Sequence, residues 1–516
     1  MFRWSLRGRE VILGFGVLAT AAAGGCRDVQ NGRLDDLSVG RRPAQTRAAA
    51  SDSSTMIPRA ATARSIFLIT IDTLQADHLG CYGYPRDTSP AIDTIARTGI
   101  RFEQAMAQWP KTTPSFASMF TGLYPHSTGV ERACGLVIDD RFTMLAERLR
   151  DAGYRTIGVT WNPNLGREFG FGQGFDVYLE MDRDPPRPAG LERVSGPKWL
   201  HGLNDFALWE LSKTPAEQPV FLWVHYINPH APYLPHNRFK DKFVDDPLFD
   251  GSHTARFLSR EEDVEFGNIG GINSHVRLGN ETRVAYYVSQ YDAAIRTADL
   301  AIGRLLGRIG ATGRLEDSLV IITADHGEGL GKHDLYFDHG PLPYDDCLHV
   351  PLILKVPGIA GGRTVPEPVA LIDLAPTILD WAGLVSDSSL EGQSLLARIA
   401  SDEPVDTLVF SGAGYAGDYQ RIVRYGRWKL IFVPSPSDRE LMTGAEFELY
   451  DLEADPHENE NLAERRPDLV DALKRPLMAW IEAGRARAAE PARAPGELEP
   501  ETEQQLRELG YIRSSR

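Results

Sequence analysis

Residues 318–340 read SLVIITADHGEGLGKHDLYFDHG, and this stretch indicates both a fold class and a site. Residues 319–323 form a short apolar run rich in β-branched side chains, which is typical of a strand buried on both faces of a parallel sheet. Asp325 and His326 follow where the run stops. Ligands of open α/β sheets bind at the carboxyl ends of strands, so this carboxylate and imidazole are placed to hold a metal ion. A polar loop without a metal is the alternative for this pair taken alone.

A second strand pattern also ends in a carboxylate. Residues 66–71 read IFLITI, and Asp72 follows them. The run predicts another buried strand with a carboxylate at its tip. Read alone, Asp72 could instead cap the next turn. Residues 220–224 form a further apolar strand pattern, after which come His225 and Tyr226.

A possible nucleophile lies in residues 108–122, QWPKTTPSFASMFTG. Proline suits the first turn of a helix, so Pro114 predicts a short helix over residues 115–121, followed by a glycine. Thr112 and Thr113 then lie at or just before the helix N-terminus. There the unpaired amides and the positive end of the helix dipole would stabilise an anion, or an alkoxide formed from a threonine hydroxyl. A simple N-cap is the alternative.

Length and charge restrict the class of protein and its partners. The chain has 516 residues, enough for a large α/β core with a smaller domain appended. Its 55 basic and 71 acidic residues give a net charge of −16. This balance excludes nucleic acid as an expected partner, because little would neutralise phosphates in bulk. A small anionic ester remains possible, because a bound metal and a few cations can override the overall field.

The N-terminal region has the pattern of an export signal. Three arginines among the first nine residues precede an apolar run over residues 11–23, which is too short to span a bilayer comfortably. Small residues before Cys26 resemble a bacterial lipoprotein cleavage site, so residues 1–26 are predicted to be a signal peptide with a possible lipid attachment at Cys26. Residues 27–63 lack apolar periodicity and predict a disordered tether. We expect an exported protein of the periplasm or cell envelope, with Cys26 as the candidate site of a lipid tether to a membrane.

Five ordered segments together resemble the sulfatase family of the alkaline-phosphatase superfamily: LITIDTLQADHLGCYGY, TTPSFASMFTGLYPHSTGV, HYINPHAPYLP, VIITADHGEGLG and HVPLILKVPG. The resemblance runs from about residue 66 to about residue 462. It implies an α/β sandwich with a large central mixed sheet flanked by helices, and a small C-terminal α+β domain with an antiparallel sheet. We therefore expect a catalytic domain over residues 64–400, a small domain over 401–487 and a tail over 488–516.

The resemblance also implies roles for particular residues. Asp72, Asp325 and His326 match the family's ligands for one divalent metal ion. Calcium is the family default, while the imidazole tilts the site towards manganese or zinc. His230 matches a histidine that contacts the ester and can protonate the leaving group. His339 falls where sulfatases usually carry a lysine beside the substrate anion, and a protonated imidazole could supply a similar, pH-dependent charge.

Several positions depart from the family pattern. Thr112 occupies the place of the cysteine or serine that sulfatases convert to formylglycine, so no formylglycine is expected. Phe116 replaces the supporting arginine, and Thr73 replaces a further aspartate. Where a lysine and a histidine would be expected, Asn162 and Asn164 offer the polar contacts. Each departure removes a feature that suits sulfate hydrolysis.

Three functions are compatible with this pattern. The favoured one is a metal-dependent hydrolase of a sulfuric or phosphoric ester, with Thr112 as nucleophile and additional metal ligand, and His230 and His339 as catalytic and substrate-binding residues. Asn162 is a further candidate for substrate binding. Threonine serves as nucleophile in phosphodiesterases, phosphonate hydrolases and phosphoethanolamine transferases of the superfamily, which favours phosphodiesters or phosphonates. The alternatives are a phospho-headgroup transferase and a non-catalytic, anion-binding lipoprotein. The expected partner is a small anionic ester or a sulfated or phosphorylated glycan.

Overall fold

The computed structural model describes residues 64–131, 136–180, 198–247, 249–259, 269–384, 388–401, 405, 407–414, 418–487, 492–494, 496 and 498–509. The predicted signal peptide, the lipid attachment at Cys26 and the tether up to residue 63 lie outside these ranges. Within them, no helix combines the length and the apolar character needed to cross a membrane.

A nine-stranded mixed sheet forms the centre of the larger part of the molecule. Its strand order is β10-β2-β9-β6-β1-β5-β3-β4, and β11 also pairs with β2. Strands β6, β1, β5, β3 and β4 run parallel, whereas β9 is antiparallel to both β2 and β6. The strands are β1 (Ile66–Ile71), β2 (Ile100–Met106), β3 (Arg155–Thr160), β4 (Val177–Glu180), β5 (Val220–Tyr226), β6 (Leu319–Ala324), β9 (His349–Lys355), β10 (Arg363–Val365) and β11 (Val369–Ala370).

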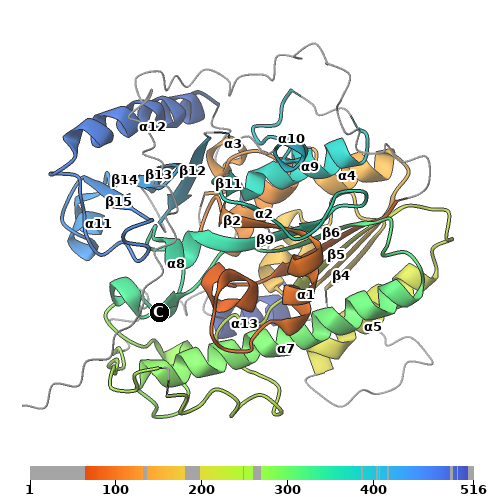
Figure 1. The fold of residues 1–516 in the computed structure, drawn as a ribbon, viewed down its shortest axis with the longest axis horizontal. Coiled ribbons are helices and arrows are strands. Elements are labelled where there is room, and N and C mark those ends of the chain that lie inside the picture. Colours follow the sequence, from red (N-terminus) through yellow and green to blue (C-terminus); the bar gives the residue numbers. More distant parts are fainter. Residues whose placement is uncertain are drawn as a thin grey trace, which may run out of the picture.

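Helices cover both faces of this sheet (Figure 1). One layer contains α1 (Pro90–Thr98), α5 (Lys198–Ser212) and α7 (Val284–Ala311), and the other contains α2 (Thr112–Thr121), α4 (Leu145–Asp151) and α9 (Leu374–Trp381). The central strands β1, β5 and β6 are therefore buried along their whole length, as their apolar sequences predict. Shorter elements are α3 (Pro125–Thr128), α8 (Asp345–Leu348), α10 (Leu396–Ala400), β7 (Gly329–Leu330), β8 (Tyr336–Asp338), η2 (Ala76–His78), η3 (Gly80–Tyr82), η4 (Pro163–Leu165), η5 (Arg167–Phe169), η7 (Ser274–Val276), η8 (Lys332–Asp334) and η9 (Leu371–Asp373).

A smaller antiparallel sheet follows in the C-terminal part. It contains β12 (Leu408–Ala413), β13 (Gln420–Tyr425), β14 (Trp428–Phe432) and β15 (Phe447–Asp451) in that order, with α11 (Pro436–Leu441) in the connection and α12 (Pro467–Arg487) packed against β13 and β14. The predicted α/β sandwich with a small antiparallel sheet is thus confirmed. The exact domain boundaries stay predictions. Within the expected tail, α13 (Pro500–Glu508) buries Leu506 completely and contacts η4.

Helix α2 begins earlier than its sequence suggested. Thr112 is its first residue and Pro114 its third, whereas the prediction started the helix at or after the proline. Proline is tolerated throughout the first turn because the amides there have no partner within the helix, so it does not fix the starting residue. The helix ends at Gly122 in the left-handed conformation, with φ of 69°.

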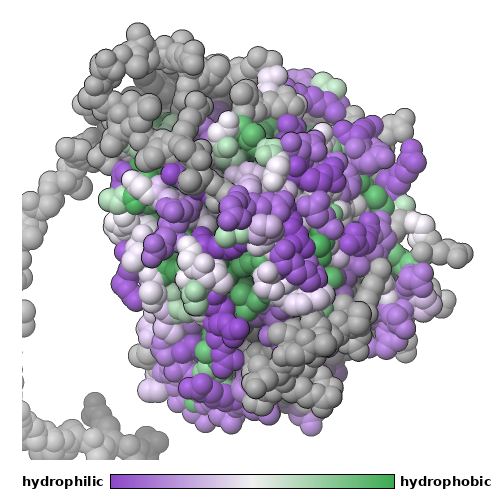
Figure 2. Space-filling view, turned by 90° about the vertical axis from the view of Figure 1, so that its right-hand side faces the viewer, coloured by the Kyte–Doolittle hydropathy of each residue, from purple (hydrophilic) through white to green (hydrophobic). Residues whose placement is uncertain are grey.

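The face of the molecule in Figure 2 is mainly hydrophilic, with hydrophobic residues scattered among polar ones.

Candidate active site

The three predicted metal ligands meet at the carboxyl ends of the central strands. Parallel pairing sets Ile71 of β1 opposite Ala324 of β6, so the residues that follow, Asp72 and Asp325, lie side by side. With His326 they offer ligand atoms that all lie within 4.8 Å of one another, and all three residues are buried. The register of two strands therefore creates the cluster.

The tautomer of His326 suits it to bind a cation. Its Nδ1 lies 2.9 Å from the carbonyl oxygen of Gly327, which can only accept a hydrogen bond, so Nδ1 carries the proton. The unprotonated Nε2 lies 3.5 Å from Oδ2 of Asp325 and 3.9 Å from Oδ1 of Asp72. Burial lowers the pKa of His326 to about 3, although the charge of Asp72 opposes this shift, and the neutral imidazole is the form that ligates metals.

Two carboxylate oxygens provide the test of whether a cation fits. Oδ1 of Asp72 and Oδ2 of Asp325 are buried and accept no hydrogen bond from any described residue. Burial and the neighbouring Asp72 charge raise the pKa of Asp325 well above its ordinary value. Burying two carboxylates whose oxygens lack hydrogen bonds or a positive partner costs free energy, and a divalent cation between them would remove that cost. The donor set therefore fits a divalent metal ion, while calcium, manganese or zinc as its identity stays a prediction.

A chain of hydrogen bonds fixes the orientation of Asp72. Nε1–H of Trp223 donates to Oγ1 of Thr70 at 2.9 Å, and the Thr70 hydroxyl donates to Nδ1 of His225 at 2.9 Å. Nε2–H of His225 then donates to Oδ2 of Asp72 at 3.2 Å. Burial would raise the pKa of Asp72, but this hydrogen bond and the nearby histidines outweigh it and lower the pKa to about 2. The chain therefore keeps Asp72 ionised and aimed at the ligand cluster.

Asn162 lies beside the same carboxylate. Its Nδ2 donates to Oδ2 of Asp72 at 2.5 Å, and its Oδ1 accepts the amide hydrogen of Asn164 at the start of η4. The structure thus places Asn162 in contact with a metal-ligand candidate. Its predicted contact with substrate stays a prediction.

Thr112 begins helix α2 at the edge of the cluster. Its Oγ1 lies 3.4 Å from Nε2 of His326, and the residue is almost completely buried. One turn later the Phe116 ring packs edge-on against His225 with centroids 5.0 Å apart, and 5.2 Å from the centroid of Trp223. The aromatic side chain at the position of the family's arginine therefore packs beneath the site and supports the histidine that holds Asp72.

Two further histidines complete the site. Nδ1 of His230 donates to the carbonyl oxygen of Ala231 at 2.5 Å, and Nδ1 of His339 lies 3.0 Å from Oε1 of Glu328. The centroids of the two rings are 5.2 Å apart, and the His339 ring lies 4.3 Å from that of His326. All the predicted catalytic and ligand residues are thus brought together by the fold.

Comparison with known proteins agrees with this geometry. The sequence profile of the family described as "Sulfatase" matches residues 64–384, more than half of the chain. The chain belongs to the sulfatase family. A second profile, "N-sulphoglucosamine sulphohydrolase, C-terminal", matches residues 331–482 of this sulfatase-family hydrolase. The predicted resemblance is confirmed.

Named relatives of this sulfatase-family hydrolase differ in their activities. An ulvan-active sulfatase of Formosa agariphila is 27% identical over 421 residues, 78% of this chain and 77% of that protein. A "multifunctional alkaline phosphatase superfamily protein" of Trinickia caryophylli is 26% identical and covers 78% of this chain and 91% of its own. The phosphonate monoester hydrolase of Agrobacterium radiobacter superposes with a TM-score of 0.63 at 22% identity, over 85% of this chain and 98% of its own, and so shares the fold.

The surroundings of His230 and His339 favour neutral imidazoles. Burial lowers the pKa of His230 and brings that of His339 well below its ordinary value, and the charge of Lys111 contributes in the same direction to both. The lysine-like charge expected of a protonated His339 therefore lacks support from its surroundings near pH 7. Its role as a proton donor or substrate contact in this sulfatase-family site stays a prediction.

Three residues near the site of this sulfatase-family hydrolase had no role assigned from the sequence: Lys111, His225 and Glu328. His225 could have been found, because it is a polar residue within an apolar strand and pairs in register with Thr70 of β1. Lys111 directly precedes Thr112, and Glu328 lies two residues after His326. Nothing in the local sequence pattern shows where either side chain points.

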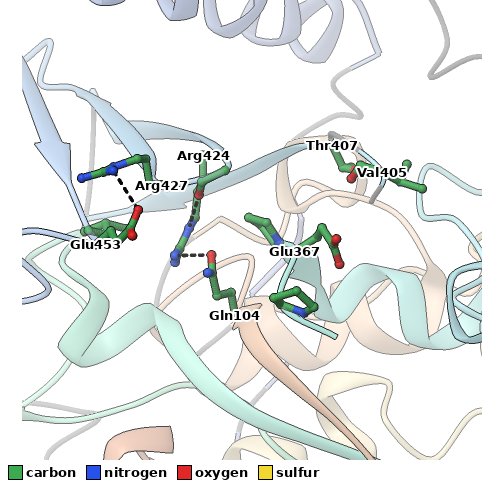
Figure 3. A pocket seen from close by; sticks show the side chains of 11 residues that line it. Gln104, Glu367, Val405, Thr407, Arg424, Arg427 and Glu453 are labelled. Carbon is green, nitrogen blue, oxygen red and sulfur yellow. Dashed lines mark hydrogen bonds and ion pairs between the residues drawn. The ribbon is translucent and has the colours of Figure 1, made fainter. Parts of the chain in front are cut away.

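A separate cavity of about 280 Å³ lies near β13 and β14 and shares no residue with the ligand cluster. In Figure 3 its two arginines are occupied: Arg424 donates to Oε1 of Gln104 at 2.6 Å, and Arg427 pairs with Oε2 of Glu453 at 2.8 Å. Its volume falls just below the range of about 300–1,000 Å³ usual for small-molecule sites. The ligand cluster at the strand ends therefore stays the candidate active site.

Proposed function

We propose that the protein is a metal-dependent hydrolase that cleaves a sulfuric or phosphoric ester with the Thr112 hydroxyl as nucleophile. The observation that carries this proposal is the position of Thr112 Oγ1, 3.4 Å from Nε2 of His326. That nitrogen lies 3.5 Å and 3.9 Å from the buried oxygens of Asp325 and Asp72 that accept no hydrogen bond from the described residues. Few structural roles need a hydroxyl, an imidazole and two carboxylates to converge in a buried site. Asp72, Asp325 and His326 would hold the metal, with Thr112 beside it.

Each group at the site has a separate role in the proposed reaction. A divalent ion bound there would supply the positive charge that lowers the pKa of the attacking hydroxyl and balances the oxygens of the transferring group. Oγ1 of Thr112 forms a bond to sulfur or phosphorus while the bond to the leaving oxygen breaks. Nε2 of His230 or His339 takes the proton that Oγ1 of Thr112 releases and gives it to the leaving oxygen. In the second step the same nitrogen takes a proton from the attacking water, whose oxygen bonds to sulfur or phosphorus, and returns that proton to Oγ1 of Thr112 as the covalent ester breaks. The N-terminus of α2 favours the negative charge that develops.

The ester type is the less constrained part of the proposal. A sulfated glycan is supported by the ulvan-active sulfatase among the relatives. A phosphodiester or phosphonate is supported by Thr112 in place of a formylglycine precursor and by the apolar Phe116 in place of arginine. Both classes place one anionic, tetrahedral group against the same residues.

A substrate panel tests the proposal directly. Full-length protein is assayed with an aryl sulfate, an aryl phosphate monoester, an aryl phosphodiester and an aryl phosphonate, each with calcium, manganese or zinc. We expect turnover of at least one class to fall more than about 1,000-fold in Thr112→Ala, because the nucleophile is lost. The matched control is Thr113→Ala in the same helical turn, which should keep most of the activity.

The outcomes separate the alternatives. Turnover that survives Thr112→Ala but disappears in Thr113→Ala would contradict the assigned nucleophile. Transfer to an added alcohol in preference to water would favour the phospho-headgroup transferase. A folded, metal-loaded protein that binds anionic glycans but turns over none of the panel would support the non-catalytic alternative.

A further inference from the structure

A buried lysine stands directly before the proposed nucleophile. Lys111 is the N-cap residue of α2, with an extended backbone (φ −152°, ψ 145°), and only 6% of its surface is exposed. Because it adjoins Thr112 in the chain, its backbone has a fixed position relative to that hydroxyl. A buried ammonium is expensive unless nearby negative charge compensates it, so its location requires a reason.

The ammonium lies above the hairpin that carries His339. Nζ of Lys111 is 3.6 Å from Oδ1 of Asp338, with 8% and 14% of the two side chains exposed. Asp338 ends β8 and also accepts the amide hydrogen of His339 at 2.7 Å. The distance of 3.6 Å between Nζ and Oδ1 is that of an ion pair and is longer than an ordinary hydrogen bond. A lysine ammonium has three N–H donors, so it can interact with a second acceptor as well. The charge therefore lies between the start of α2 and the hairpin.

The positive charge of Lys111 influences all three histidines of the candidate site. After burial itself, Lys111 is the largest influence that lowers the pKa of His339, and it also lowers those of His230 and His326. The geometry agrees: the ammonium pairs with Asp338, the residue before His339, and the His339 ring lies 5.2 Å from that of His230 and 4.3 Å from that of His326.

That space needs a cation besides the metal. Asp72 and Asp325 contribute two buried carboxylates to it, Asp338 adds a third one residue before His339, and an ester anion must enter near them. The side chain at the position one turn into α2, Phe116, is apolar and packs on His225. An anion brought near this many carboxylates is repelled unless a positive group meets it directly.

We propose that Lys111 is the substrate-binding cation of this site, and that its ammonium takes an anionic oxygen of the ester while the adjacent Thr112 attacks. This inference rests on the proposed function. Asp338 is the resting partner of the ammonium and competes with the substrate for it. Because the cation and the nucleophile are consecutive residues at a helix N-terminus, binding of the anion also sets the distance between the ester and the attacking oxygen.

Anion binding tests this role without any turnover. Inorganic sulfate is titrated calorimetrically into metal-loaded, full-length protein, and inorganic phosphate into chelator-treated protein. We expect Lys111→Met to weaken both by at least about 10-fold, the scale of one lost charge-assisted hydrogen bond, and Lys111→Arg to restore much of the affinity. Asp338→Asn should act in the opposite direction and tighten anion binding, because it removes the competitor.

Controls make the result specific. Lys332→Met removes another lysine paired with an aspartate, Asp346 at 3.0 Å, and should leave anion affinity within about twofold of the wild type. The metal affinity of Lys111→Met should be unchanged, which separates substrate binding from a role in holding the ligands. Thermal unfolding confirms that each variant is folded.

Two results would overturn the inference. One is wild-type anion affinity in folded Lys111→Met, and the other is an equal loss of metal and anion affinity, which would make Lys111 a structural residue. Neither depends on turnover. If Thr112→Ala retains full hydrolysis while Lys111→Met loses anion binding, the nucleophile is wrong and the anion site stands.

Discussion

Replacing Gly327 with alanine should damage the metal loop through a single backbone contact. A Cβ atom at this position would lie 2.1 Å from the carbonyl oxygen of Asp346, whereas real Cβ contacts stay beyond 3.0 Å. The obstructing atom belongs to the backbone and cannot rotate away as a side chain would. Gly327 directly follows the ligand His326, so the loop or α8 must shift to accommodate the methyl group.

The structure allows the cost to be estimated. The two backbones are held by hydrogen bonds from Gly327 N–H to the Cys347 carbonyl at 2.8 Å and from Glu328 N–H to the Asp346 carbonyl at 3.0 Å. Relief of the overlap strains or breaks both. Overpacking of about 1–3 kcal/mol with one or two weakened hydrogen bonds gives a loss of about 2–4 kcal/mol in the free energy of unfolding. The carbonyl of Gly327 also orients the His326 ring, so metal affinity should fall about 10- to 100-fold.

Two measurements check this prediction. Urea unfolding with chelator present gives the stability change of the metal-free chain, and chelator competition gives the metal affinity. The matched control is Gly307→Ala on the exposed face of α7, where an added Cβ meets nothing within 4 Å. That change should stabilise the protein by about 0.5–1 kcal/mol, because alanine is the better helix former. Gly327→Ala with wild-type metal affinity and a stability change below about 0.5 kcal/mol would refute the steric argument.

Two other expectations follow from buried histidines. His225→Phe keeps the aromatic packing but removes the donor to Asp72, so metal affinity should fall about 10- to 100-fold, and an unchanged affinity in chelator competition would show that the donor is dispensable. His126 lies buried against Trp480, and burial, followed by the charges of nearby arginines, lowers its pKa to about 3. Below about pH 6.5 the His126 side chain therefore binds a proton in the unfolded chain but not in the folded chain. The free energy of unfolding should decrease by about 1.4 kcal/mol for each unit by which the pH is lowered between pH 6 and 4. In urea titrations across that range His126→Phe should lose this contribution, and parallel curves for the two proteins would contradict it.

The fold class and the ligand triad could be predicted because they depend on local patterns. Runs such as residues 66–71 and 319–323 are too apolar to lie anywhere but inside a sheet, and carboxylates that follow buried strands must emerge at its carboxyl edge. The start of α2 was predicted too late because Pro114 is compatible with any position in a first turn. Thr112 was still correctly placed at the helix N-terminus.

The sequence by itself determined which elements form and that Asp72, Asp325 and His326 end or follow strands. Only the tertiary structure decided which side chains meet there. The contact of His225 with Asp72 spans 153 residues, and that of Lys111 with Asp338 joins α2 to a hairpin more than 200 residues later. Such contacts depend on strand order, register and the packing of helices on the sheet, and these are set by the burial of the whole core. Local periodicity reports what is buried, whereas the partner of a buried charge is fixed only when the chain has closed around it.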